Sequence, residues 1–159
     1  MTAGRTDGLV AGLPPVGTAT VFRKTVTEAD VGLFAGITGD FAPQHTDDEY
    51  MRERPQGRRI AHGALVLGLT STAAARLCTE SGVTALSYGY DRVRFLQPVY
   101  LGETVQVDYR IREVDPGAHK AFADMRATTP DGRLVLVGTH ILYCYDETEG
   151  PHEPQGGTE

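Results

Sequence analysis

Two short segments of the chain hold the residue types that proton-transfer chemistry needs. In the first segment, Asp40 and His45 lie five residues apart, with Pro43 between them. An imidazole can give or take a proton near neutral pH, and a carboxylate beside it can hold a water molecule. A turn stiffened by proline can direct both side chains at one point. The alternative is that Asp40 only caps a turn and that His45 lies on the surface.

The second segment, Ile60 to Ala64, contains a glycine at the expected start of a helix. There the N–H of Gly63 would lie at the positive end of the helix dipole, without an acceptor inside the helix. Such a donor can stabilise an oxyanion, and glycine lets a ligand carbonyl approach closely. Ser71 follows about two helical turns later and could face the same cavity. The alternatives are that Gly63 only allows a tight helix start and that Ser71 bonds a carbonyl of the preceding turn.

Helical patterns surround both segments. A capping-box pattern predicts a helix over residues 27–38, with an apolar stripe that reaches Ile37. Residues 40–46 are expected to form a loop, and a short helix is expected over residues 46–54. From residue 63 to residue 80 the pattern is apolar on nearly all sides, which predicts a buried helix.

The rest of the chain has the patterns of strands. A first short strand is expected over residues 17–25. Residues 105–112 and 121–128 alternate between apolar and polar side chains, which is typical of half-buried strands. Residues 86–96 are rich in aromatic and β-branched side chains, and residues 133–145 are almost continuously apolar, as in a central strand. One long helix and an antiparallel meander predict an α+β fold in which a curved sheet wraps around the helix.

The composition is that of a globular protein with an acidic balance. The chain has a formal net charge of −6, which disfavours general nucleic-acid binding, because such proteins are basic. Two cysteines far apart in sequence form neither a metal-ligand pattern nor a disulfide framework, which favours a reducing, cytoplasmic setting. The most apolar window, residues 60–78, contains polar and charged side chains, which argues against a membrane span.

The chain is expected to form one domain. We predict a flexible N-terminal arm at residues 1–13, a single domain at residues 14–145 and a disordered acidic tail at residues 146–159. No linker or internal repeat interrupts the middle segment. Common catalytic motifs, such as a phosphate-binding loop or a zinc-protease HExxH helix, are absent from the sequence.

Three separated motifs together resemble the MaoC-like, (R)-specific enoyl-CoA hydratases of the hot-dog fold. The family signature reads roughly G-D-x-N-P-x-H, then I-x-H-G-M at a helix start, then a P-V-x-x-G-D-T turn. The matching positions are Gly39, Asp40, Pro43 and His45, then Ile60, His62 and Gly63, and then the segment from Pro98 to Thr104. The resemblance spans about residues 18–145. It implies the fold described above, paired into a dimer and most simply a homodimer.

The resemblance implies an enzyme that reversibly hydrates a trans-2-enoyl thioester to the (R)-3-hydroxyacyl thioester. The thioester of coenzyme A or of an acyl carrier would be the substrate, and no metal ion or separate cofactor is expected. Asp40 and His45 would hold and activate the water and move the second proton at the α-carbon. The N–H of Gly63 would bind the thioester oxygen. Ser71 matches a serine that helps build the site in some members, and His62 is expected to contact the substrate.

The sequence departs from the family pattern at two positions. Ala42 stands where the family has asparagine, which leaves the acid and base in place but changes the loop that meets the substrate. Ala64 stands where a large residue is common, which would widen the pocket. Arg58 and Arg59 lie in an arginine-rich segment between the motifs and are expected to bind the phosphates of coenzyme A. The alternative is a solvated loop whose arginines pair with nearby glutamates.

Two other functions stay open. A hot-dog thioesterase would share the fold and the Gly63 donor, but its carboxylate would direct water at the thioester carbonyl. The pairing of Asp40 with His45 argues against that activity. A non-catalytic subunit that binds acyl-CoA, or that completes the tunnel of a partner, would agree with the loss of asparagine at residue 42.

Overall fold

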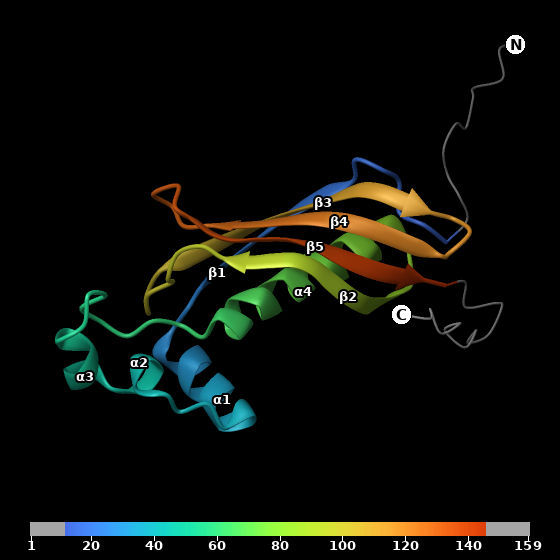
Figure 1. The fold of residues 1–159 in the computed structure, drawn as a ribbon. Coiled ribbons are helices and arrows are strands. Elements are labelled where there is room, and N and C mark those ends of the chain that lie inside the picture. Colours follow the sequence, from blue (N-terminus) through green and yellow to red (C-terminus); the bar gives the residue numbers. More distant parts are fainter. Residues whose placement is uncertain (1–11, 146–159) are drawn as a thin grey trace, which may run out of the picture.

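The computed structural model describes residues 12–145 and shows one antiparallel sheet with a long helix along one face (Figure 1). In chain order its elements are β1 (Ala19–Thr25), α1 (Glu28–Thr38), α2 (Pro43–Thr46), α3 (Asp48–Arg52), α4 (Gly63–Ser81), β2 (Ala85–Phe95), β3 (Thr104–Asp115), β4 (Lys120–Thr128) and β5 (Leu134–Cys144). The sheet order is β1-β3-β4-β5-β2, and every neighbouring pair is antiparallel. The predicted α+β hot-dog arrangement is therefore confirmed, with α4 as its helix.

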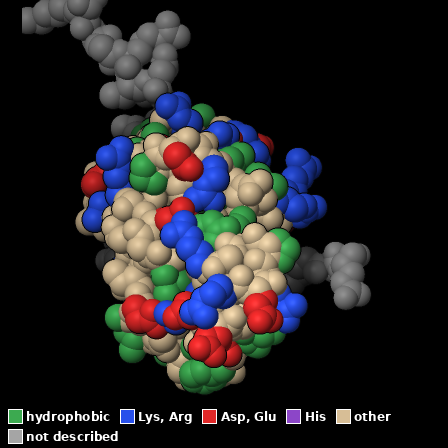
Figure 2. Space-filling view, turned by 90° about the vertical axis from the view of Figure 1, so that its left-hand side faces the viewer, with side chains coloured by type: hydrophobic (Ala, Val, Ile, Leu, Met, Phe, Trp, Pro, Cys, Tyr) green, Lys and Arg blue, Asp and Glu red, His purple; other side chains and the backbone are tan. Residues whose placement is uncertain are grey.

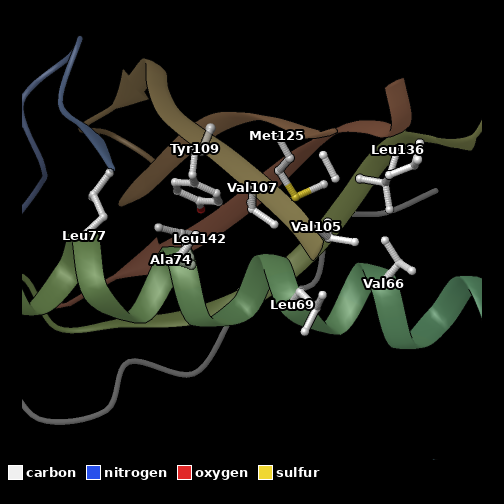
Figure 3. Close-up of a cluster of buried hydrophobic side chains, with 14 of the residues drawn as sticks. Val66, Leu69, Ala74, Leu77, Val105, Val107, Tyr109, Met125, Leu136 and Leu142 are labelled. Carbon is white, nitrogen blue, oxygen red and sulfur yellow. The ribbon is translucent and has the colours of Figure 1, made fainter. Parts of the chain in front are cut away.

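The core lies between the sheet and α4. The alternating patterns of β3 and β4 place one row of each strand toward the helix, as predicted. These rows are Val105, Val107, Tyr109 and Ile111 in β3 and Ala121, Ala123, Met125 and Ala127 in β4. Figure 3 shows several of them packed toward Val66, Leu69, Ala74 and Leu77 of α4. This packing fixes the helix, and with it Gly63, against the sheet.

Helix α4 is buried on one face only, which corrects the expectation of a helix covered on nearly all sides. Its buried side chains are Val66, Leu69, Thr70, Ala73, Ala74 and Leu77. Exposed small residues follow the opposite face, namely Ala64, Gly68, Ser71 and Ala75. One sheet can cover only one side of a helix, so the apolar count of the sequence overstated the burial that a single chain provides.

Helix α1 begins and ends where the sequence predicts. The side chain of Thr27 accepts from the N–H of Asp30, and the Asp30 carboxylate accepts from the N–H of Thr27 at 2.8 Å. Gly39 ends the helix with φ 79, a left-handed conformation that favours glycine. The apolar stripe is only partly buried, because Ile37 is 83% exposed. Figure 1 shows α1 projecting away from the sheet, so only its inner side is covered.

The described residues begin close to the predicted domain boundary. Residues 1–11 and 146–159 lie outside them, and with them the predicted acidic tail and most of the predicted arm. Leu13, which we assigned to the arm, is 6% exposed and belongs to the core, so the packed chain starts earlier than predicted. Within residues 12–145, no helix combines the length and apolarity needed to cross a membrane.

A polar cluster around His140 lies inside the core near β2. The ring is 1% exposed, with its Nδ1 2.9 Å from the hydroxyl of Tyr109 and its Nε2 2.8 Å from that of Ser87. Both hydroxyls can donate or accept, so a neutral imidazole is fully hydrogen-bonded. Burial lowers the pKa of His140 from its ordinary value of 6.5 to about 4. No spacing in the sequence predicts this cluster, because its three residues come from β2, β3 and β5.

We expect His140 to make the protein less stable as the pH falls from 7 to 4. The unfolded chain binds a proton at this histidine near pH 6.5, whereas the folded chain does so only near pH 4. Unfolding therefore takes up a proton in this window, and the free energy of unfolding should fall by up to about 3 kcal/mol. Urea titrations across the window measure the fall. It should shrink in His140→Asn, whose amide keeps a partner for Tyr109, and an unchanged pH dependence would exclude His140 as its cause.

Candidate active site

The chain between α1 and α2 forms a compact turn around Asp40. The N–H of Asp40 donates to Thr38 Oγ1 at 3.3 Å, and the Asp40 carboxylate accepts from the N–H of Ala42 at 3.2 Å. Pro43 then starts the one-turn helix α2, which replaces the second part of the loop that we expected over residues 40–46, whereas residues 40–42 are not helical. The Asp40 side chain stays 51% exposed, so water can reach its carboxylate. Ala42 contributes only backbone atoms to the turn: its N–H donates to Asp40, and its carbonyl accepts from the N–H of His45 at 2.9 Å and from the hydroxyl of Thr46 at 3.3 Å.

His45 is held by the second motif. It lies on α2 and is only 6% exposed. Its Nδ1 lies 2.7 Å from the carbonyl oxygen of Ile60. A carbonyl can only accept, so Nδ1 carries the proton and donates it. In the neutral ring Nε2 is therefore the unprotonated nitrogen, which is the form that a general base needs.

His62 completes a tight cluster with these two residues. Its Nε2 donates to the carbonyl oxygen of Asp40 at 2.9 Å and lies 3.9 Å from the Asp40 carboxylate. Its ring stacks on that of His45, with centroids 3.7 Å apart and planes 26° apart. The structure therefore brings together Asp40, His45 and His62, whose side-chain ligand atoms lie within 4.8 Å of one another.

The spacing of this cluster suits a metal ion, but the orientation of its rings does not. An imidazole binds a metal through a nitrogen lone pair, which lies in the plane of the ring. The rings of His45 and His62 are stacked with centroids 3.7 Å apart and planes only 26° apart, so one ion cannot lie in both planes at bonding distance from a nitrogen of each ring. The arrangement fits proton transfer by Asp40 and His45 better than metal binding.

Gly63 connects this cluster to a cavity of about 300 Å³ beside the start of α4. It is the first residue of the helix, where N–H groups have no acceptor within the helix. The cavity walls are mostly apolar and include Ile60, Gly63, Val66, Phe95, Pro98 and Val135. A Cβ at residue 63 would lie 3.2 Å from the Phe95 ring, so glycine suits this close contact. No sequence motif marked Phe95, because it reaches Gly63 only through the folded sheet.

Not all of the predicted site residues line this cavity. Its walls in the described part of the chain include neither Asp40 nor His45, although His62 of their cluster precedes Gly63 directly. Ser71 is not a lining residue either, and it lies on the exposed face of α4. The single chain therefore brings the acid, the base and the helix start close together, and leaves Ser71 apart from them.

Arg59 is tied into the fold and is not free to bind a phosphate as we expected. Its guanidinium donates to Glu28 and Asp48, each at 2.8 Å, and its side chain is 15% exposed. The hydrogen bonds that Arg59 donates to the Glu28 and Asp48 carboxylates raise its pKa further above its already high value. The side chain therefore fastens α1 and α3 to the segment that precedes α4.

Arg58 keeps more freedom than its neighbour. Its side chain is 59% exposed, lies over the ring of Tyr100 at 4.1 Å and makes a 3.5 Å ion pair with Glu103. Neither contact is strong enough to prevent it from binding a phosphate. Figure 2 shows basic and acidic side chains interleaved on the end of the molecule that carries α3, without a broad basic patch.

Comparison with known proteins agrees with these motifs. The family model described as MaoC like domain matches residues 14–129. A 3-hydroxybutyryl-CoA dehydratase of Methylorubrum extorquens is 32% identical over 127 residues, covering 80% of this chain and 78% of that protein. An (R)-specific enoyl-CoA hydratase of Rhodospirillum rubrum is 32% identical over 123 residues, covering 77% and 82%.

Solved structures agree as well. The unliganded R-hydratase PhaJ1 from Pseudomonas aeruginosa has a TM-score of 0.73 and 29% identity, covering 83% of each chain. An (R)-hydratase from A. caviae involved in PHA biosynthesis has a TM-score of 0.74 and 25% identity, covering 84% of this chain and 98% of that one. The likeness extends over nearly the whole of the described fold.

Proposed function

This chain belongs to the MaoC-like domain family, and we propose that it catalyses the reversible hydration of trans-2-enoyl thioesters to (R)-3-hydroxyacyl thioesters. The observation that carries the proposal is the fixed tautomer of His45. Its Nδ1 donates to the Ile60 carbonyl, which leaves Nε2 unprotonated in the neutral ring, and one nitrogen of that ring lies within 4.8 Å of an Asp40 carboxylate oxygen. A base, an acceptor for water and a free helix N–H are the groups that this reaction needs.

The proposed reaction adds one water across the C2–C3 double bond. Asp40 accepts a hydrogen bond from the water, and Nε2 of His45 takes a proton from it as its oxygen bonds to C3. The double-bond electrons move toward the thioester carbonyl, whose oxygen accepts from the N–H of Gly63. The pair then returns the proton to C2. The substrate gains one water and no electrons leave or enter it, so the reaction itself requires no redox cofactor.

We expect two copies of the chain to form the working enzyme. The exposed face of α4 carries the small residues Ala64, Gly68, Ser71 and Ala75 beside the longer Arg76, and within residues 12–145 β2 is an edge strand with one unpaired side. Exposed apolar residues on or beside β2 are Leu86, Tyr88, Phe95 and Leu96. An apolar edge strand is a ready surface for pairing with another strand. A second copy that pairs there would cover α4, and Ser71 would then lie between the copies, close to the acyl group.

The test of the function is one incubation of the purified protein with crotonyl-CoA. Enoyl absorbance and free thiol are followed together, because each distinguishes one activity. Loss of absorbance without thiol, with 3-hydroxybutyryl-CoA of the R configuration as product, supports the hydratase. Release of thiol supports a thioesterase instead. Neither change, together with binding of the thioester, supports a non-catalytic subunit.

We expect Arg58 to contact the phosphates of a coenzyme A substrate. Changing Arg58 to alanine should raise the KM for crotonyl-CoA by about fivefold, in the range of one charge-assisted hydrogen bond. The KM for the crotonyl thioester of pantetheine, which lacks the nucleotide, should not change. Steady-state kinetics with both substrates provide the measurement, and equal effects on the two would rule out the phosphate contact.

A further inference from the structure

His62 connects the two motifs by contacts that point into the protein. The ring is 2% exposed and contacts the rings of Phe34 and His45, at centroid distances of 4.9 and 3.7 Å. Its Nε2 donates to the backbone carbonyl of Asp40 in the first motif. His45 of the first motif donates in turn to the backbone carbonyl of Ile60 in the second. Each histidine therefore fixes the backbone of the other one's segment.

The contacts of His62 leave one of its polar atoms unpaired. Because Nε2 carries the donated proton, Nδ1 holds the lone pair in the neutral ring. Within residues 12–145, this Nδ1 is buried and has no hydrogen-bond partner. An unpaired buried polar atom reduces stability, and an apolar ring of similar shape would avoid the loss. Packing alone therefore favours phenylalanine at residue 62, whereas the hydrogen bond to Asp40 requires a donor.

We propose that His62 is a positioning residue of the hydratase site. It holds the backbone of Asp40 and packs on one face of the His45 ring. The Asp40 carboxylate and Nε2 of His45 can then hydrogen-bond to the same water molecule. This inference rests on the proposed function and assigns His62 a role other than contact with the substrate. A displacement of about 1 Å at reacting groups can lower a rate by on the order of 10²-fold. Loss of the hydrogen bond should therefore lower kcat and leave KM nearly unchanged.

Two variants separate the hydrogen bond from the packing. His62→Phe keeps an aromatic ring against His45 but removes the donor and the unpaired nitrogen. His62→Gln keeps an amide N–H at the place of Nε2. For crotonyl-CoA hydration we expect kcat to fall by on the order of 10²-fold in the Phe variant and by less than about 10-fold in the Gln variant. The thermal unfolding midpoint of the Phe variant should equal or exceed that of the wild type, because the unpaired atom is gone.

The outcomes that would overturn the inference are distinct. His62→Asn is the matched control, since its amide is one bond too short to reach the Asp40 carbonyl, and a Gln variant no faster than it excludes the hydrogen bond. Wild-type kcat in the Phe variant, or a rise in KM alone, excludes a positioning role. A loss of both stability and activity in the Phe variant also excludes a positioning role, because it would show that His62 only stabilises the fold.

The wild-type enzyme, assayed beside the variants, separates this inference from the function on which it rests. If the wild type hydrates no enoyl thioester, the proposed function fails and the role of His62 falls with it. If the wild type is active and the Phe variant is equally active, the function stands and only the role of His62 is lost.

Discussion

Replacing His45 by asparagine is expected to lower kcat/KM for enoyl-thioester hydration by on the order of 10³-fold, within the range that general acid–base groups contribute. The asparagine amide can take the place of Nδ1 and keep the hydrogen bond to the Ile60 carbonyl, which is 2.7 Å long in the wild type. Nothing then occupies the place of Nε2, so the variant loses the base and keeps the hydrogen bond to Ile60. The kinetics of crotonyl-CoA hydration, with unfolding curves as the control for folding, measure the effect.

Asp40→Asn is the companion variant, since it has the same shape without the charge. Its side-chain oxygen can still accept from the N–H of Ala42, as the carboxylate does at 3.2 Å, so the turn should persist. We expect a loss of similar size, because the two side chains act on one water. The double variant should then be little worse than either single one, as for residues that act as a unit. Full activity in one single variant would remove that residue from the mechanism, and additive losses would show that the two act separately.

The sequence predicts the parts of this fold that depend on local chemistry. The capping box of Thr27 and Asp30 and the alternation in β3 appear in the structure because neighbouring residues determine them. We overestimated the burial of α4, because burial depends on distant parts of the structure and not on neighbouring residues. An apolar pattern shows that a helix needs cover, but it does not show whether its own sheet or a second chain provides the cover.

The resemblance to the family selects Asp40, His45 and Gly63, but it does not reveal how they are held. The hydrogen bond from His62 to Asp40 joins residues 22 positions apart, and that from Arg59 to Glu28 joins residues 31 apart. No spacing rule links such pairs, because they come together only when helices α1, α2 and α3 fold against the segment that precedes α4. The same two contacts change the roles expected from sequence. Arg59 connects α1 and α3 to the segment before α4 and is not free to bind a phosphate, and in our proposal His62 orients Asp40 and His45.

Replacing Gly63 by proline is expected to lower kcat by on the order of 10²–10³-fold, the loss seen when one oxyanion donor is removed. Proline deletes the N–H, and its ring adds a Cβ near Phe95 and a Cδ in the place of the amide hydrogen. It is tolerated at the first position of a helix, where the N–H has no acceptor within the helix. The preceding residue, His62, has φ −60 and ψ 136, which is the extended conformation that proline requires before it.

Gly63→Ala is the matched control for the proline variant, because both add the same Cβ. That atom would lie 3.2 Å from the Phe95 ring in both variants, so both bear this crowding, and the proline differs by the lost donor and by the Cγ and Cδ of its ring. We therefore expect a small loss of kcat in the alanine variant and the large loss only in the proline variant, with similar unfolding midpoints. Equal activities at saturating crotonyl-CoA would mean that the thioester oxygen is bound elsewhere. The N–H of Gly63 would then have no part in the reaction, and the contact between glycine and Phe95 would explain the residue by packing alone.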